Sequence, residues 1–317
     1  MSPGGTLRTT DVARAAAILR GGGLVAFPTE TVYGLGADGL DAAAVRRIFA
    51  AKGRPADNPL ILHVGAAGEA GAYGVLDGSA AALAARFWPG PLTLVVPARP
   101  GLPEALRAGL PTVALRCPEH PLARALIAAA GRPLAAPSAN RSGRPSPTSA
   151  DAVLDDLDGR IDAVLDGGPC PRGLESTVLD CTGSEPAILR LGALPAESLG
   201  LAPEAVATGD GRSPGTRHRH YAPAVPVVLC RDLAEGLQRH PGAAVLWPAA
   251  SAAAAGLRPG PAVHWWSDRP EGRAAELFAA LRRLERSGRP CILAPVLEDR
   301  GLDAATMDRL RRAAAGP

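Results

Sequence analysis

The sequence has 317 residues, 47% of them hydrophobic and 21% charged, a composition typical of soluble globular proteins. This length favours about two domains. Aromatic residues make up only 3%, which argues against a platform of exposed rings for stacking bases. The formal charge of +3 is mildly basic and the arginines are scattered, so we expect no stable nucleic-acid binding.

The first two hundred or so residues predict an α/β fold, with helices covering an open, twisted, mixed sheet. Apolar runs bounded by Gly and Pro indicate strands, and amphipathic runs behind N-cap residues such as Thr10 and Asp41 indicate helices. In chain order we expect helix 10–19, strand 24–27, helix 41–51, strand 60–64, helix 79–87, strands 93–97 and 112–116, helix 121–130, strand 134–136, helix 149–157, and strands 163–165, 177–180 and 187–191.

A shift in composition after residue 200 predicts a linker and a second domain. After Pro226 the alternation of strands and helices resumes, which predicts a smaller Rossmann-like α/β domain. Its expected elements are strands 227–230, 244–247 and 291–294 and helices 271–286 and 304–314. We therefore divide the chain into a domain of residues 1–200, a linker of residues 201–225 and a domain of residues 226–317.

The cysteine pattern and the N-terminal residues indicate a cytoplasmic protein. The five cysteines are far apart and include no CxxC pair, which favours reduced thiols over a zinc site or a disulfide framework. The N-terminal residues lack the pattern of a signal peptide, and no run of about 18 apolar residues occurs, so we expect no membrane span.

Three polar loops rich in Pro and Gly directly follow predicted strands: residues 28–31, 137–140 and 167–176. In open α/β sheets the ligand crevice lies beyond the carboxyl ends of the strands. We expect these loops to line one cleft.

The glycines of residues 34–39 match the dinucleotide fingerprint G-x-G-x-x-G and are followed by a predicted helix. The first glycine lies several residues beyond its strand and not in its turn, as the fingerprint requires. A nicotinamide-dependent enzyme therefore stays a weak alternative. The sequence also lacks a P-loop motif, so any ATP site must be of another type.

Lys52 is the only lysine among 34 Lys and Arg residues. It lies at the end of a predicted helix in a polar region rich in turns. A position that keeps lysine in so arginine-rich a chain suggests work that needs a compact ammonium or a group able to lose its proton. The alternative is a cation that only complements a helix dipole.

Arg116 ends an otherwise apolar strand and needs an anion, because an unpaired buried cation is costly. That anion is either an internal Asp or Glu or a substrate carboxylate, and Arg190 raises the same question. His63, at the end of its strand, is by itself best read as a packed histidine. His218 and His220 have no Cys or carboxylate partners nearby, so we expect no protein metal site.

Six ordered motifs resemble those of threonylcarbamoyl-AMP synthases with a YrdC-like catalytic domain, in the long form that carries a C-terminal domain. They are FPTETVYGLG, KGRPxxNPL, WPGPLTLV, PSAN, DGGPCPxGxEST and SPGxRxRHYAP. The last motif departs mildly at Thr216 and His218, where methionine and tyrosine are common in the family.

The resemblance implies a nucleotidyltransferase that joins L-threonine, bicarbonate and ATP into threonylcarbamoyladenylate and releases pyrophosphate. Mg²⁺ is expected to accompany the ATP, without a tightly bound protein metal site. Other proteins would then transfer the activated group to tRNA. The linker, including Tyr221, is expected to act as a lid over the active site.

The resemblance also implies roles for individual residues. Lys52 and Arg54 would be catalytic, acting by charge stabilisation, since no side chain looks like a covalent nucleophile. The residues implied to hold threonine are Thr31, His63, Arg116, the backbone at Ala136, and Ser176. Those implied to hold ATP are Arg54, Asn58, Thr112, Ser138, Asn140, Ser146, Arg190 and Tyr221.

Two further functions compete with this one. A pure RNA-binding module would need a basic face with exposed aromatic rings, and its binding would depend steeply on salt. A carbamoyltransferase built on a YrdC-like domain would instead accept carbamoyl phosphate in place of threonine and bicarbonate.

Overall fold

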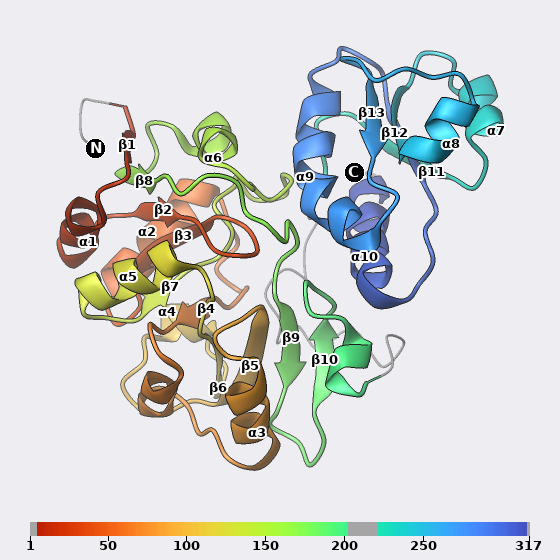
Figure 1. Ribbon diagram of the computed structural model, residues 1–317. Coiled ribbons are helices and arrows are strands. Elements are labelled where there is room, and N and C mark those ends of the chain that lie inside the picture. Colours follow the sequence, from red (N-terminus) through yellow and green to blue (C-terminus); the bar gives the residue numbers. More distant parts are fainter. Residues whose placement is uncertain (1–4, 202–220, 316–317) are drawn as a thin grey trace.

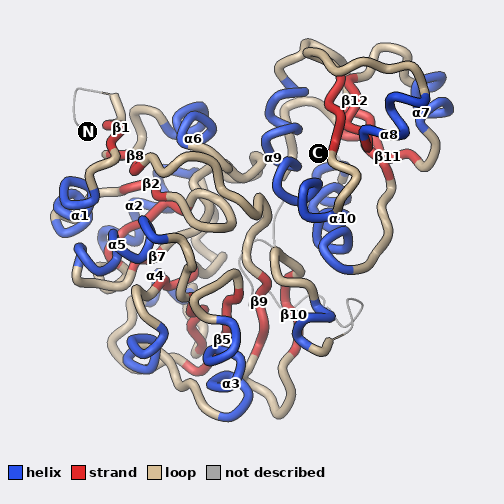
Figure 2. The backbone as a smooth tube through the Cα atoms, viewed as in Figure 1, coloured by secondary structure: helices blue, strands red, loops and turns tan. Residues whose placement is uncertain are grey.

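The computed structural model describes residues 5–201 and 221–315, and the path of the chain can be followed in Figures 1 and 2. The described residues form a ten-stranded sheet and a separate four-stranded sheet. The expected linker of residues 201–225 falls mostly on residues 202–220, which lie outside the described residues, as do Thr216, His218 and His220.

The larger sheet mixes parallel and antiparallel strands, which confirms the predicted fold class. For example, β4 (Ile61–His63) runs parallel to β6 (Thr112–Arg116), whereas β2 (Val25–Phe27) runs antiparallel to β3 (Gly34–Asp38). The other strands are β1 (Leu7–Thr9), β5 (Leu92–Pro97), β7 (Leu134–Ala135), β8 (Ala163–Leu165), β9 (Thr177–Asp180) and β10 (Ala187–Arg190). Their spatial order is β1-β8-β2-β3-β7-β4-β6-β5-β9-β10.

Helices cover the larger sheet on both faces. Successive residues of a strand point to opposite faces, so Val25 and Phe27 share a core with α1 and α5, whereas Ala26 shares the core of α2, α3 and α6. These helices are α1 (Val12–Arg20), α2 (Ala42–Lys52), α3 (Gly78–Phe87), α5 (Pro121–Ala130) and α6 (Ala150–Leu157). Shorter turns are η1 (Ala67–Ala72), α4 (Glu104–Arg107) and η2 (Ala196–Leu199).

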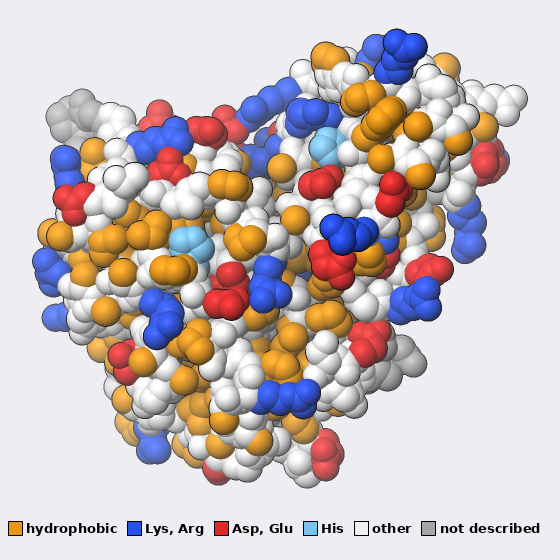
Figure 3. Space-filling view, in the orientation of Figure 1, with side chains coloured by type: hydrophobic (Ala, Val, Ile, Leu, Met, Phe, Trp, Pro, Cys, Tyr) orange, Lys and Arg blue, Asp and Glu red, His pale blue; other side chains and the backbone are white. Residues whose placement is uncertain are grey.

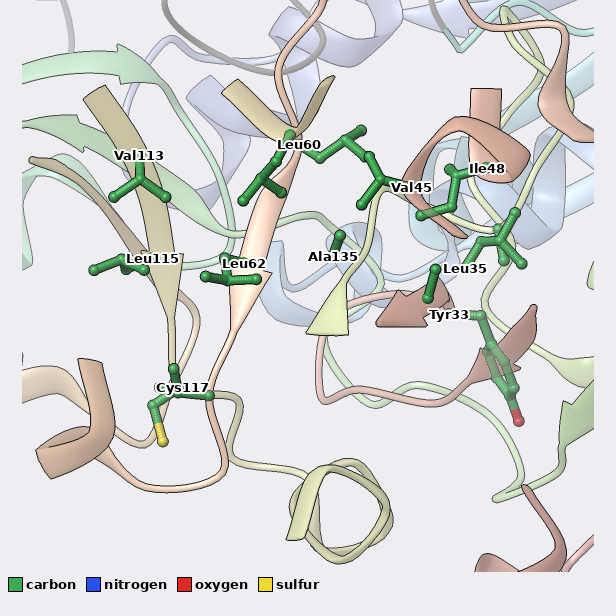
Figure 4. Packing of buried hydrophobic residues seen from close by; sticks show 14 of the residues in the cluster. Tyr33, Leu35, Val45, Ile48, Leu60, Leu62, Val113, Leu115, Cys117 and Ala135 are labelled. Carbon is green, nitrogen blue, oxygen red and sulfur yellow. The ribbon is translucent and has the colours of Figure 1, made fainter. Parts of the chain in front are cut away.

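The core under α2 is made of aliphatic side chains, in keeping with the scarcity of aromatic residues. Figure 4 shows Leu35 of β3, Leu62 of β4 and Leu115 of β6 in the same cluster as Val45 and Ile48 of α2. All five are nearly or fully buried. This packing fixes α2 against the sheet and so fixes the place of the lysine at its end.

The ends of α2 are set by its sequence. The Asp41 side chain caps the helix by accepting a hydrogen bond of 2.7 Å from the Ala43 N–H, and Gly53 ends it with a φ of +61°, as expected. The predicted N-cap of α1 was wrong. Asp11, not Thr10, accepts a hydrogen bond of 3.0 Å from the Arg14 N–H.

The glycine motif of residues 34–39 is not a nucleotide-binding turn. Residues Gly34–Asp38 form β3, whose backbone pairs with β2 and β7. A Cβ at Gly36 would lie 2.8 Å from the Phe27 ring, and one at Gly34 would lie 3.3 Å from it. The two glycines therefore let a phenylalanine of β2 pack against the neighbouring strand.

The smaller sheet is parallel throughout, which confirms the expected Rossmann-like α/β unit. Its strands are β11 (Val227–Cys230), β12 (Ala244–Pro248), β13 (Val263–Trp266) and β14 (Ile292–Pro295), in the spatial order β11-β14-β12-β13. The helices between and after them are α7 (Leu233–Arg239), α8 (Ala249–Ala254), α9 (Pro270–Glu285) and α10 (Gly301–Ala314).

Helices α9 and α10 lie on the side of the smaller sheet that faces the larger one (Figure 1). Arg282 of α9 forms a buried ion pair of 2.7 Å with Asp156 of α6. A Cβ at Gly173 would lie 2.5 Å from the backbone of α9, so only glycine fits at this close approach. The two units are thus tightly packed against each other.

The surface shows no single charged field on the face in Figure 3, where Lys and Arg side chains are scattered among Asp and Glu. Within the described ranges, no helix has the length and apolar content needed to cross a bilayer.

Candidate functional site

A pocket opens where the loops after β2 and β7 meet the ends of β4, β6, β9 and β10. It holds about 550 Å³ of empty space, part of it open to solvent. Ile61 lines it and packs in a cluster made only of strand residues, including Val95 and Val178. The pocket therefore lies over a stretch of sheet where no helix contributes to the core.

Most of the predicted site residues line this pocket. They are Thr31, Arg54, His63, Arg116, Ala136, Ser138, Ser176, Arg190 and Tyr221. Thr29, Pro137 and Glu175 also line it, so each of the three loops expected to line one cleft contributes to this pocket. The structure adds Val32, Gly34 and Ile61, which the sequence analysis did not assign to a site.

Lys52 is buried just behind the pocket wall. Its ammonium donates to the carbonyl oxygens of Ser138, at 2.6 Å, and of Asn140. Burial, followed by the nearby Arg54 guanidinium, lowers the pKa of Lys52 well below its usual value. The lone lysine therefore holds the 137–140 loop against α2.

Arg54 is a buried cation of the pocket lining without a matching carboxylate. Its Nη2 donates to the carbonyls of Asn58 and Pro59 at 3.4 and 3.2 Å. Its Nε has no hydrogen-bond partner, and no carboxylate of the described residues lies within ion-pair distance. Burial lowers its pKa to about 10, and Arg190 acts in the same direction. Such a group favours an anionic ligand.

Arg116 has an internal partner, one of the two alternatives left open by the sequence. Its Nη2 donates to Glu30 Oε1 at 2.6 Å and to Thr31 Oγ1 at 2.9 Å, while its Nε lies 3.4 Å from the Gly90 carbonyl. Its Nη1 makes no hydrogen bond to the described residues, so one edge of the guanidinium stays available for a ligand in the pocket.

His63 lies beside Arg116 across the parallel pair β4 and β6. It is buried, and its ring meets Phe27 edge-on with 6.2 Å between centroids. Burial and the positive charge of Arg116 lower its pKa to about 3, so the imidazole is neutral near pH 7.

Ser176 and Arg190 line the pocket together and contact each other. Arg190 donates to the Ser176 carbonyl at 2.8 Å and to its hydroxyl at 3.1 Å. The same hydroxyl lies 2.7 Å from Thr93 Oγ1. Arg190 thus holds the residue at the start of β9 in place.

Five predicted residues do not line the pocket: Lys52, Asn58, Thr112, Asn140 and Ser146. Asn140 accepts a 2.5 Å hydrogen bond from Ser138, and Ser146 donates to Glu175, so both contact residues of the lining. Thr112 begins the strand that Arg116 ends, about 13 Å away at the usual strand rise.

Sequence reasoning missed three residues with buried charge. Glu30 pairs with Arg116, and Glu175 pairs with Arg309 of α10 at 3.0 Å. Both carboxylates stand inside the quoted motifs, so their place beside two predicted site residues was the available signal. Arg309 lies outside every motif, and nothing local marks it.

No cluster of His, Cys, Asp and Glu suited to a metal ion occurs in residues 5–201 and 221–315.

Family models match most of the chain. The Sua5–YciO–YrdC model, described as "Telomere recombination", matches residues 17–192. The model described as "Threonylcarbamoyl-AMP synthase, C-terminal domain" matches residues 186–315.

Curated relatives and solved structures agree with these matches. A threonylcarbamoyl-AMP synthase of Pyrococcus abyssi is 43% identical over 94% of this chain and 92% of its own, and one of Bacillus subtilis is 42% identical over 98% and 95%. The crystal structure of P. abyssi Sua5 complexed with L-threonine has a TM-score of 0.87 and 41% identity, covering 98% of this chain and 96% of that one. The chain belongs to the threonylcarbamoyl-AMP synthase family of nucleotidyltransferases, in its Sua5 form with a C-terminal domain.

Proposed function

We propose that this protein makes L-threonylcarbamoyladenylate from L-threonine, bicarbonate and ATP and releases pyrophosphate. This would be the first step in forming N6-threonylcarbamoyladenosine in tRNA. The family and the binding of L-threonine by the similar P. abyssi structure support the proposal.

The observation that carries the nucleotide part of the proposal is Arg54. Its buried guanidinium has no carboxylate partner and an unsatisfied Nε among residues 5–201 and 221–315, which is costly unless a ligand supplies the anion. A triphosphate does so with several acceptor oxygens. Arg190 and Tyr221 line the same pocket, and Ser138 lies on the loop held by Lys52.

The threonine part of the proposal rests on Arg116 and the polar groups near it. The open edge of Arg116 suits a carboxylate, and Thr31, Ser176 and the backbone at Ala136 offer polar groups beside it. A neutral His63 adds a ring that can accept or donate one hydrogen bond without attracting a second anion.

The chemistry needs positioning more than a nucleophile from the protein. The threonine amine first combines with bicarbonate to form a carbamate, and one water is released. A carbamate oxygen then bonds to the α-phosphorus of ATP, and the bond from that phosphorus to the bridging oxygen of pyrophosphate breaks. Negative charge gathers where these groups meet. The compact ammonium of Lys52 and the planar guanidinium of Arg54, with its several donors, would offset this charge.

The remaining nucleotide contacts are proposed for Asn58, Thr112, Asn140 and Ser146. Mg²⁺ would arrive with the triphosphate and help to neutralise it. The product would pass to other proteins that transfer the threonylcarbamoyl group to tRNA, in the cytoplasm where ATP is available.

The test is pyrophosphate release from ATP in the wild type and in Lys52→Arg. We expect release to require both threonine and bicarbonate and to fall by about 100-fold in the variant, because a planar guanidinium cannot take the place of an ammonium between two carbonyls. Arg47→Lys, an exchange on the exposed side of the same helix, is the matched control and should keep full activity.

Release that ignores threonine in the wild type would overturn the proposed function. Full activity in Lys52→Arg would instead remove the role of Lys52 and leave the cationic centre to Arg54 and Arg116.

A further inference from the structure

We propose that Arg309 of the C-terminal domain is a positioning residue for the active site. It holds the Glu175 carboxylate away from the anionic ligands and keeps Arg190 on Ser176. The inference rests on the proposed function, which it extends by a residue outside the catalytic domain.

Arg309 is fully buried although it lies on α10, far from the larger sheet in sequence. Its Nε donates to Glu175 Oε2 at 3.0 Å, its Nη2 to the Leu191 carbonyl at 2.8 Å, and its Nη1 to Asp308 at 2.6 Å. Each nitrogen of the guanidinium therefore has an acceptor, two of them across the domain boundary. A planar guanidinium bonded in this way fixes both the distance and the orientation of the Glu175 carboxylate relative to α10.

Glu175 is an unexpected residue for a pocket that should receive a carboxylate and a triphosphate. It lines the pocket, and its other oxygen accepts a hydrogen bond from Ser146. Burial acts against its charge, but Arg309 and then Arg190 outweigh burial and lower its pKa, so it is ionised near pH 7. Without a partner, this charge would repel the substrates.

Arg190 is the second cation that acts on Glu175. Its nitrogens donate to the Ser176 carbonyl and hydroxyl. If Arg309 were removed, the buried carboxylate would draw Arg190 toward itself, because an uncompensated charge in this setting is costly. Ser176 would then lose its hydrogen bonds from Arg190 and would be held by its side chain only through Thr93.

Arg309 also supports a second wall of the pocket. Its guanidinium carbon lies 5.0 Å from the centroid of the Tyr221 ring, within cation–π range. The same ring also stacks on Phe278 of α9, with 5.4 Å between the ring centroids. One side chain of α10 thus contacts both Glu175 and Tyr221, two residues that line the pocket.

The experiment compares full-length wild type with Arg309→Met, Arg309→Met/Glu175→Gln and Arg273→Met. The last variant breaks the buried Arg273–Asp303 pair, which lies inside the C-terminal domain and outside the pocket. Steady-state pyrophosphate release gives kcat and KM for threonine and ATP, calorimetry gives threonine affinity, and thermal unfolding reports stability.

We expect Arg309→Met to lower kcat/KM by about 10- to 100-fold, mainly through KM. Removing the carboxylate charge in the double variant should restore most of the loss. Arg273→Met should lower the unfolding temperature and leave KM unchanged. A crystal structure of Arg309→Met should show Arg190 turned from Ser176 toward Glu175. Should Arg309→Met fail to fold, Arg309→Lys keeps the charge without the planar guanidinium and should show a smaller loss of the same kind.

The inference would be overturned by any of three results. These are KM values in the Arg309 variants equal to those of the wild type, no recovery of kcat/KM in the double variant, and an Arg190 side chain that stays on Ser176. Absence of threonine-dependent release in the wild type would contradict the proposed function instead. The Arg190 readout does not depend on that activity, so the two failures can be told apart.

Discussion

Two buried arginine–glutamate pairs contact the pocket, and their partners come from different places. Arg116 and Glu30 both belong to the larger domain. Arg309 and Glu175 belong to different domains and are 134 residues apart in sequence. The first pair needs only contacts within the larger sheet unit, whereas the second bridges the two packed units. The pocket therefore depends on both domains although most of its lining comes from one.

Breaking the Arg116–Glu30 pair should have the largest effect on stability and on threonine binding. Arg116→Leu leaves Glu30 as an uncompensated buried charge and removes the proposed partner of the threonine carboxylate. We expect about 3–5 kcal/mol of lost stability in urea unfolding and loss of threonine binding by calorimetry.

The double variant Arg116→Leu/Glu30→Leu separates the two effects. It should recover most of the stability, since a buried ion pair can be exchanged for apolar groups at little cost, but it should not recover threonine binding. Threonine binding by either variant would show that the carboxylate is held elsewhere.

A pH titration of stability can sharpen the comparison, because His63 lies beside the Arg116–Glu30 pair. Arg116 lowers its pKa and Glu30 raises it. Its folded pKa of about 3 lies below the ordinary 6.5, so the unfolded chain takes up the proton first as the pH falls. The resulting stability is present above pH 6.5 and is lost progressively toward pH 3. It amounts to about 2 kcal/mol between pH 7 and pH 5.

Urea unfolding of the wild type and His63→Asn at both pH values measures this contribution. The other histidines and the carboxylates are common to both proteins. Any difference in how the free energy of unfolding changes with pH therefore belongs to His63. Equal changes with pH would mean that the imidazole is charged in the folded protein.

The smallest expected effect comes from a change that touches neither pair. Asp41→Ala removes the N-cap of α2, the helix that ends at Lys52, and should cost about 1 kcal/mol in thermal or urea unfolding. The KM values should stay at their wild-type level because packing holds the helix in place. A raised KM would show that small losses of stability alone disturb the pocket and would weaken conclusions drawn from the two pairs.

The sequence predicted the elements whose signal is local. The strand at 112–116 and the helix at 121–130 were placed with their observed bounds, because an apolar run and a Pro at the helix start suffice to define them. β3 was missed, since two glycines have little intrinsic strand preference and only the packing of Phe27 explains them. β13 was missed as well, since it is a partly exposed strand at the edge of the smaller sheet and so lacks a buried apolar run.

The candidate site divides in the same way. Arg116 was recognised as a cation in need of an anion from its apolar surroundings alone. Which anion it binds could not be decided, because Glu30 reaches it only through the three-dimensional path of the chain. Arg309 could not be found at all, since a charged residue on an amphipathic helix looks like any surface arginine.

The burial of Lys52 has a practical consequence for chemical labelling. It carries the only ε-amine in the sequence, with a relative exposure of 3%. An amine-reactive ester will therefore modify this side chain only when the contact between α2 and the 137–140 loop opens. Peptide mass spectrometry separates acylation at Lys52 from acylation of the α-amine, and so follows the opening of one wall of the pocket in native protein without any substitution.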